Sequence, residues 1–78
     1  AAYDQLRRFR LADRAYAEAL KIAGPGPELL NNRGYSYLLR GDLARASRDL
    51  SEAAAMDPGN ERIQMNLRAL DRKARGRI

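Results

Sequence analysis

Apolar residues recur along this chain at the spacing of an amphipathic α-helix. Between residues 8 and 23 one helical face is apolar at steps of three and four, and the pattern returns 34 residues later. The two sets in register are Phe9, Ala12, Tyr16 and Ala19, followed by Leu43, Ala46, Leu50 and Ala53. A face that recurs at this period predicts stacked helical units, which form binding surfaces more often than active sites.

Glycine and proline divide the pattern into helical stretches. These are residues 1–6, 8–23, 28–40, 43–56 and about 61–75. Gly24 ends the second stretch, and Asp42 and Asn60 are suitable N-caps for the last two. Gly34 lies inside the third stretch, where glycine costs about 1 kcal/mol relative to alanine, so we expect a neighbouring helix to approach it closely. Because the connections are short, consecutive helices must pack antiparallel. The sequence therefore predicts an all-α fold without strands.

Histidine and cysteine are both absent from the chain. Their absence removes the commonest general base, the commonest metal ligands and any disulfide. Asp49 and Glu52 stand three residues apart, but we expect them on the outer face of their helix, beside Arg45 and Arg48 in ordinary ion pairs. We therefore expect no enzyme, no metal and no cofactor. The apolar runs are also far shorter than the roughly 18 residues of a membrane span.

The net charge of +5 is concentrated at the C-terminal end. Residues 61–78 hold six basic and two acidic residues, a net charge of +4. The basic residues there are Arg62, Arg68, Arg72, Lys73, Arg75 and Arg77. One alternative function is therefore the binding of nucleic acid or an acidic surface. The simpler interpretation is a solvated helix face, and with one phenylalanine and no tryptophan the chain offers little surface for stacking bases.

Residues 27–60 resemble one complete tetratricopeptide repeat (TPR), a helix–turn–helix of 34 residues. The matching residues are Gly34, Tyr37, Gly41, Asp42, Ala46, Leu50, Ala53 and Pro58, whereas Leu30 and Arg33 replace the usual tryptophan and leucine. Residues 1–26 look like a partial repeat that lacks most of its first helix, and residues 61–78 like a C-terminal capping helix with a frayed basic tail. The resemblance implies antiparallel helix–turn–helix repeats stacked in a right-handed superhelical array.

A narrower resemblance covers residues 31–43 and 58–67. These segments are similar to the TPR lipoproteins of bacterial tight-adherence (Tad, Flp-type) pilus assembly. That resemblance implies a role in pilus or secretion assembly and a periplasmic or outer-membrane location. Without it, a cytoplasmic location is the default expectation. The repeat period also suggests that the chain is the end of a longer scaffold.

In TPR proteins the first helix of each pair lines a concave groove. The resemblance assigns peptide-binding positions to Asn31, Asn32, Tyr35, Arg62 and Asn66. Asn32 and Asn66 are equivalent, and each side-chain amide could hold a peptide backbone from both sides. The alternative is that each asparagine caps a turn or faces water. The carboxylate clamp of some TPRs is disfavoured, because it needs a lysine and an arginine where Asn31 and Asn66 stand.

The expected function is therefore a non-catalytic protein–protein interaction module that binds a protein or peptide segment in the groove. The sequence does not identify this partner. Self-association is a further alternative, because an array of about two units leaves apolar ends exposed. In that case we expect a homodimer.

Overall fold

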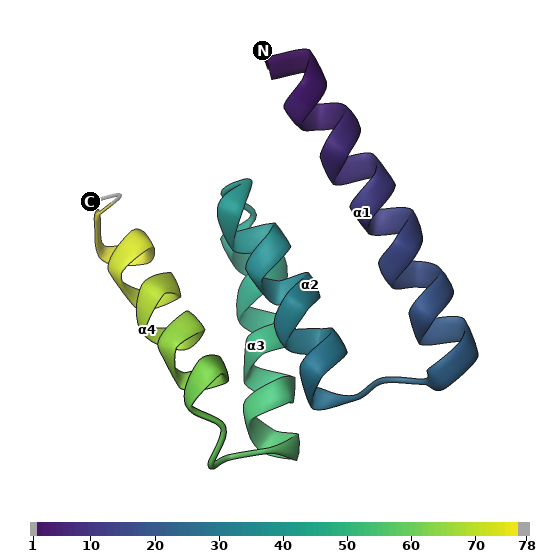
Figure 1. Ribbon diagram of the computed structural model, residues 1–78. Helices are drawn as coiled ribbons and strands as arrows, with labels where there is room; N and C mark the ends of the chain where they lie inside the picture. Colours follow the sequence, from purple (N-terminus) through teal and green to yellow (C-terminus); the bar gives the residue numbers. More distant parts are fainter. Residues whose placement is uncertain (1, 77–78) are drawn as a thin grey trace.

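The computed structural model describes residues 2–76, which form four α-helices connected by short loops (Figure 1). The helices are α1 (Ala2–Ala23), α2 (Pro27–Leu39), α3 (Leu43–Met56) and α4 (Glu61–Gly76). Each helix runs antiparallel to the one before it (Figure 1), and no strand occurs in this described part of the chain. The prediction of an all-α helical repeat fold is therefore confirmed. Arg77 and the end of the predicted basic tail lie outside the described residues.

The core lies where α2, α3 and α4 meet. Leu30 of α2, Ala53 of α3 and Ile63 of α4 are almost completely buried against one another. Ala54 and Leu67 pack at the edge of this cluster. Burial of a leucine or isoleucine side chain contributes about 1.5–3 kcal/mol, so this cluster fixes the positions of the three helices that carry the candidate site.

The helix ends form as their residue types predict. Gly24 and Gly41 adopt φ angles of +76° and +80°, which glycine tolerates best. The carboxylate of Asp42 accepts a hydrogen bond of 3.2 Å from the backbone N–H three residues on, and the amide oxygen of Asn60 accepts a similar one of 3.3 Å. These contacts satisfy free N–H groups at the first turns of α3 and α4.

Gly34 of α2 lies at a close approach to α3. A Cβ atom at this position would stand 2.8 Å from Cγ and 2.9 Å from Cδ2 of Leu50. Because Leu50 is completely buried, it has little room to move away. The predicted close approach of a neighbouring helix is therefore confirmed.

The prediction of a helix break near residue 7 is wrong, because α1 is continuous from Ala2 to Ala23. The complete repeat turns at Gly41 and Asp42, but the equivalent residues 34 positions earlier are Arg7 and Arg8. Arginine is a good helix former and lacks the freedom of glycine at positive φ, so the helix continues through this point. The first half of α1 consequently extends past the end of α2 (Figure 1). The assignment of residues 1–26 to a partial repeat stays a prediction.

Within residues 2–76, α1 packs only against α2. The joint centres on Arg40, whose guanidinium donates two hydrogen bonds to the carboxylate of Asp13, one of them 2.9 Å long. The same guanidinium lies over the rings of Phe9 and Tyr37, at 4.9 and 4.7 Å from their centroids. The hydrogen bonds from Arg40 lower the pKa of Asp13 below its ordinary value. Arg40 thus supplies hydrogen bonds and ring contacts that join α1 to the rest of the fold.

Candidate peptide-binding groove

A hollow of about 290 Å³ lies between α2 and α4. Both helices supply the lining, and α3 lies behind α2 in the view of Figure 1. The lining residues are Asn31, Asn32, Tyr35, Arg62, Met65 and Asn66. All the candidate binding residues that the TPR register assigns are therefore brought together in one place. Met65 joins them, because it follows Arg62 by three residues and so shares its helical face.

Asn31 and Asn66 form a hydrogen-bonded bridge between the two helices. The side-chain N–H of Asn66 donates to the side-chain oxygen of Asn31 over 2.9 Å. Asn31 is 5% exposed, so its oxygen depends on this bond for a partner. The second N–H and the oxygen of Asn66 make no other hydrogen bond in the described structure. The bridge therefore fixes the separation of α2 and α4 and leaves part of one amide available to a ligand.

Asn32 is exposed, and its side chain has no hydrogen-bond partner among the described residues. Both donors and the acceptor of its amide face solvent, where a peptide backbone could replace water. The predicted pair of equivalent amides is therefore unequal in the structure. Asn32 is free, whereas Asn66 shares its amide with Asn31.

Arg62 has a partner within the chain. It donates a hydrogen bond of 2.7 Å to the carboxylate of Glu28, which also accepts a bond of 3.0 Å from the side chain of Asn60. Arg62 and Glu28 are both exposed, and such surface pairs contribute at most about 1 kcal/mol. A ligand carboxylate could use the N–H groups of Arg62 that Glu28 does not engage, or could displace Glu28 at little cost.

The apolar part of the groove consists of Tyr35 and Met65, which are 46% and 59% exposed. Leu39, also exposed, follows Tyr35 by one helical turn. Leu38 is buried in the core and therefore does not belong to the groove surface. An exposed aromatic side chain beside an adaptable methionine is typical of a surface that receives an apolar side chain of a partner.

The expectation that Asp49 lies on the outer face of α3 is wrong. Its side chain is 1% exposed and accepts two hydrogen bonds, of 2.7 and 2.9 Å, from the guanidinium of Arg33 on α2. The hydrogen bonds to Asp49 raise the pKa of Arg33. Asp49 falls within the arc of α3 that also buries Ala46 and Ala53. The signal in the sequence was Arg33 itself, because a charged residue at a position that is usually leucine needs a buried partner.

The predicted ion pairs of Asp49 and Glu52 with Arg45 and Arg48 do not form among the described residues. Arg45 pairs with Asp42 over 3.1 Å, and Glu52 is exposed. In the described part of the chain, no three acidic side chains are placed so that they could hold a metal ion. None of the helices in that part has the length and apolar character required to span a membrane.

The comparisons with known proteins agree with this architecture. A family model for the tetratricopeptide repeat matches residues 27–60, the segment that contains α2, α3 and the loop before α4. Neither the comparison with curated proteins nor that with solved structures produced a match. Tetratricopeptide repeats are in general interaction domains rather than enzymes. Residues 27–60 are therefore a tetratricopeptide repeat, a module whose general role is interaction with other proteins.

Proposed function

We propose that the groove between α2 and α4 binds an extended segment of another protein. The observation that carries the proposal is the convergence of Asn32, Tyr35 and Met65 on one exposed hollow beside the Asn31–Asn66 bridge. Its volume of about 290 Å³ is at the lower limit for a small-molecule site. It suits a single side chain of a longer ligand, with the rest of that ligand lying along the groove.

Each groove residue has a distinct part in this binding. The ring of Tyr35 and the thioether of Met65 contact an apolar side chain of the partner. The amide of Asn32 hydrogen-bonds the partner backbone, and the free N–H and oxygen of Asn66 hold a second backbone group. Asn31 does not contact the ligand but keeps Asn66 in place. Arg62 exchanges Glu28 for a carboxylate where the partner presents one.

The narrower resemblance suggests the setting. If the chain works in pilus or secretion assembly, the partner is another component of that assembly, met in the periplasm or at the outer membrane. We propose no catalytic role, since the residues of the groove include no activated nucleophile or general base.

The contacts that the basic residues of α4 already make weaken the nucleic-acid alternative. Arg75 pairs with Asp71 over 2.9 Å, and Lys73 donates to the backbone oxygen of Leu38 over 3.2 Å. Of the other described basic residues on α4 only Arg68 and Arg72 have no partner. Phosphate recognition requires several available cations along one face. Nucleic-acid binding through α4 would therefore have to fall steeply with salt and be lost when Arg68 and Arg72 are both replaced by alanine.

Self-association stays an alternative, favoured by the exposed side chains of Leu11 and Ile22 on the side of α1 that no helix covers. It predicts a mass by light scattering that rises from monomer to dimer with concentration. A mass that stays monomeric across the range would remove it.

The groove proposal is tested by isolating the partner by pull-down and measuring its affinity for variants. Asn32→Ala is expected to weaken binding about fivefold to tenfold through one lost hydrogen bond. Tyr35→Ala is expected to weaken it tenfold or more. Gln5→Ala, which removes an exposed amide from α1, is the matched control and should change nothing. Unchanged affinity in both groove variants would exclude this site.

A further inference from the structure

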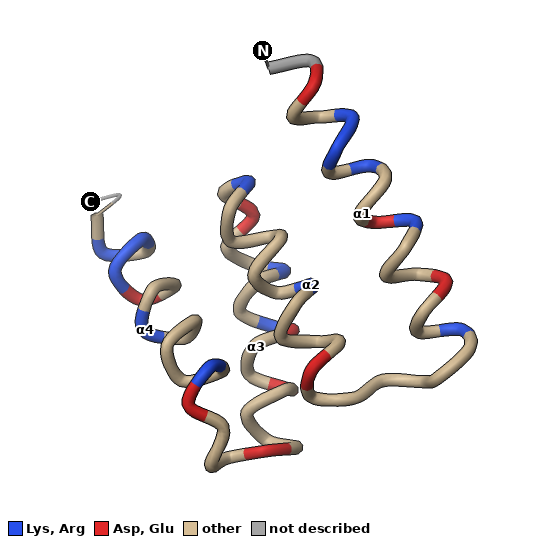
Figure 2. Tube along the Cα trace, in the orientation of Figure 1, with Lys and Arg blue, Asp and Glu red and all other residues tan. Residues whose placement is uncertain are grey.

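Four arginines between residues 7 and 14 of α1 carry positive charge that no carboxylate of the described structure neutralises. Arg7, Arg8, Arg10 and Arg14 have no carboxylate partner among residues 2–76. Most other arginines do have one. The paired residues are Arg33, Arg40, Arg45, Arg62 and Arg75. Figure 2 shows the resulting run of basic residues on the part of α1 that extends past α2. Like charges one helical turn apart repel each other, so this surface favours an anionic partner.

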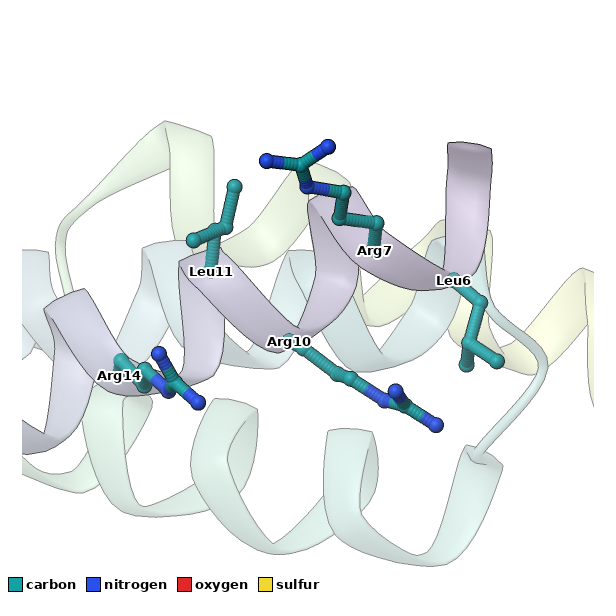
Figure 3. A pocket seen from close by; sticks show the side chains of 5 residues that line it. All are labelled: Leu6, Arg7, Arg10, Leu11 and Arg14. Atoms are coloured by element: carbon teal, nitrogen blue, oxygen red, sulfur yellow. The ribbon is translucent and has the colours of Figure 1, made fainter. Parts of the chain in front are cut away.

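Three of these arginines share a hollow with two leucines. Arg7, Arg10 and Arg14 line a space of about 270 Å³ together with Leu6 and Leu11, and every lining residue belongs to α1. In Figure 3, Arg7 and Leu11 leave one edge of the helix, and Leu6, Arg10 and Arg14 leave the other. Leu6 and Leu11 are 48% and 53% exposed. The surface therefore offers charge and apolar contact side by side.

This surface is separate from the groove. The positions 34 residues after Arg10 and Arg14 are Ala44 and Arg48 of α3, and both are exposed in the complete repeat. The positions equivalent to Arg10 and Arg14 are thus exposed to solvent in the complete repeat as well. The groove residues lie instead on α2 and α4.

We propose that this face of α1, defined by Leu6, Arg7, Arg10, Leu11 and Arg14, docks an acidic amphipathic helix of a second protein. Carboxylates of that helix pair with the three guanidinium groups, whose planar donors match a carboxylate in bidentate geometry. Apolar residues of the same helix contact the two leucines. Charge complementarity selects the partner and speeds its approach, while the leucines set its register.

Other anionic partners fit less well. The hollow has no aromatic side chain on which a base could stack, which nucleic-acid sites without sequence preference use. Leu6 and Leu11 are interrupted by arginine, whereas insertion into a membrane surface requires a continuous apolar face. The hollow is also smaller than a typical small-molecule site.

The test uses a fluorescently labelled synthetic helix in which leucine recurs every three or four residues among glutamates. Its binding to the whole chain is measured by anisotropy. The same peptide with glutamine in place of glutamate serves as the uncharged probe. The key variant replaces Arg7, Arg10 and Arg14 with alanine. The matched control removes the same charge elsewhere, by alanine at the exposed and unpaired arginines Arg48, Arg68 and Arg72. Alanine is the best helix former, so both variants should keep their helical circular dichroism.

We expect the acidic peptide to bind and the glutamine peptide to bind at least tenfold more weakly. The key variant should bind the acidic peptide with an affinity that is lower by about tenfold or more. The control variant should change less than about threefold, because its arginines are outside the surface. Equal losses in both variants would overturn the proposal, since they indicate non-specific attraction by net charge. Absence of binding, or tighter binding of anionic vesicles, duplex RNA or a second copy of the chain through this face, would also overturn it.

Discussion

Replacement of Gly34 by alanine is expected to destabilise the protein, although alanine is the better helix former. The new Cβ would stand 2.8 and 2.9 Å from two carbons of Leu50 and 3.2 Å from Cβ of Asp49. Overpacking of this kind costs about 1–3 kcal/mol, and two contacts below 3 Å to a fully buried side chain place it near the upper end. The gain in helix propensity offsets about 1 kcal/mol. The net loss should therefore be about 1–2 kcal/mol.

Urea unfolding followed by far-ultraviolet circular dichroism measures this loss as a lower transition midpoint at unchanged slope. Gly76→Ala is the matched control, because Gly76 ends a helix and a Cβ there would meet no atom within 4 Å. It should leave stability unchanged or slightly raised. A second test pairs Gly34→Ala with Leu50→Ala. Loss of the leucine costs about 2–5 kcal/mol alone but should cost at least about 1 kcal/mol less when Gly34→Ala is already present, because removal of the leucine also removes the clash.

Gly34→Ala with wild-type stability or better would refute the tight packing of α2 on α3, and so would strict additivity of the two substitutions.

Three further predictions concern the polar contacts. Arg33→Leu should destabilise the fold by about 3 kcal/mol, because it leaves the buried carboxylate of Asp49 unpaired, and Arg33→Leu with Asp49→Ala should recover most of that loss in urea unfolding. Asn66→Ala should lower the free energy of unfolding by about 1–2 kcal/mol. The double variant Asn31→Ala with Asn66→Ala should lose less than the sum of the losses of the two single variants, and additive losses would contradict the bridge. Asp13 has a pKa lowered by its arginine partner, so its contribution is present above the unfolded pKa of about 3.9 and is lost as pH falls through the lowered folded pKa. Asp13→Asn should therefore reduce the melting temperature above pH ~4 and not in stronger acid; because the Asp13 side chain is 41% exposed, the loss should stay below about 1 kcal/mol.

Helix positions and ends could be predicted from the sequence because their causes are local. Glycine at positive φ and a side-chain cap act within a few residues, and the apolar steps of three and four survive into the structure as the buried faces of α2, α3 and α4. The continuity of α1 was also a local matter, since Arg7 and Arg8 cannot make the turn that Gly41 makes. The repeat register predicts a helix break at Arg7 and Arg8, but arginine favours the continuation of the helix.

Contacts between helices were harder to predict. Asp49 and Arg33 are 16 positions apart, and helical periodicity does not predict that their side chains form an ion pair. The structure places the candidate groove residues around one hollow, because the repeat register relates α2 to α4. Their role in binding stays a prediction. The same register made Asn32 and Asn66 equivalent, yet only Asn66 meets a neighbouring amide, at Asn31. Equivalence in sequence does not determine which polar groups remain free.

Site-specific photo-cross-linking shows whether the partner lies in the groove between α2 and α4. A photoreactive phenylalanine analogue replaces Tyr35 in the groove or, as the control, Arg48 on the exposed face of α3. We expect position 35 to cross-link to one short stretch of one partner protein and Asn32→Ala to reduce the yield, while position 48 gives no such product. Cross-linking of the same partner from position 48 but not from position 35 would show that the partner binds outside the groove.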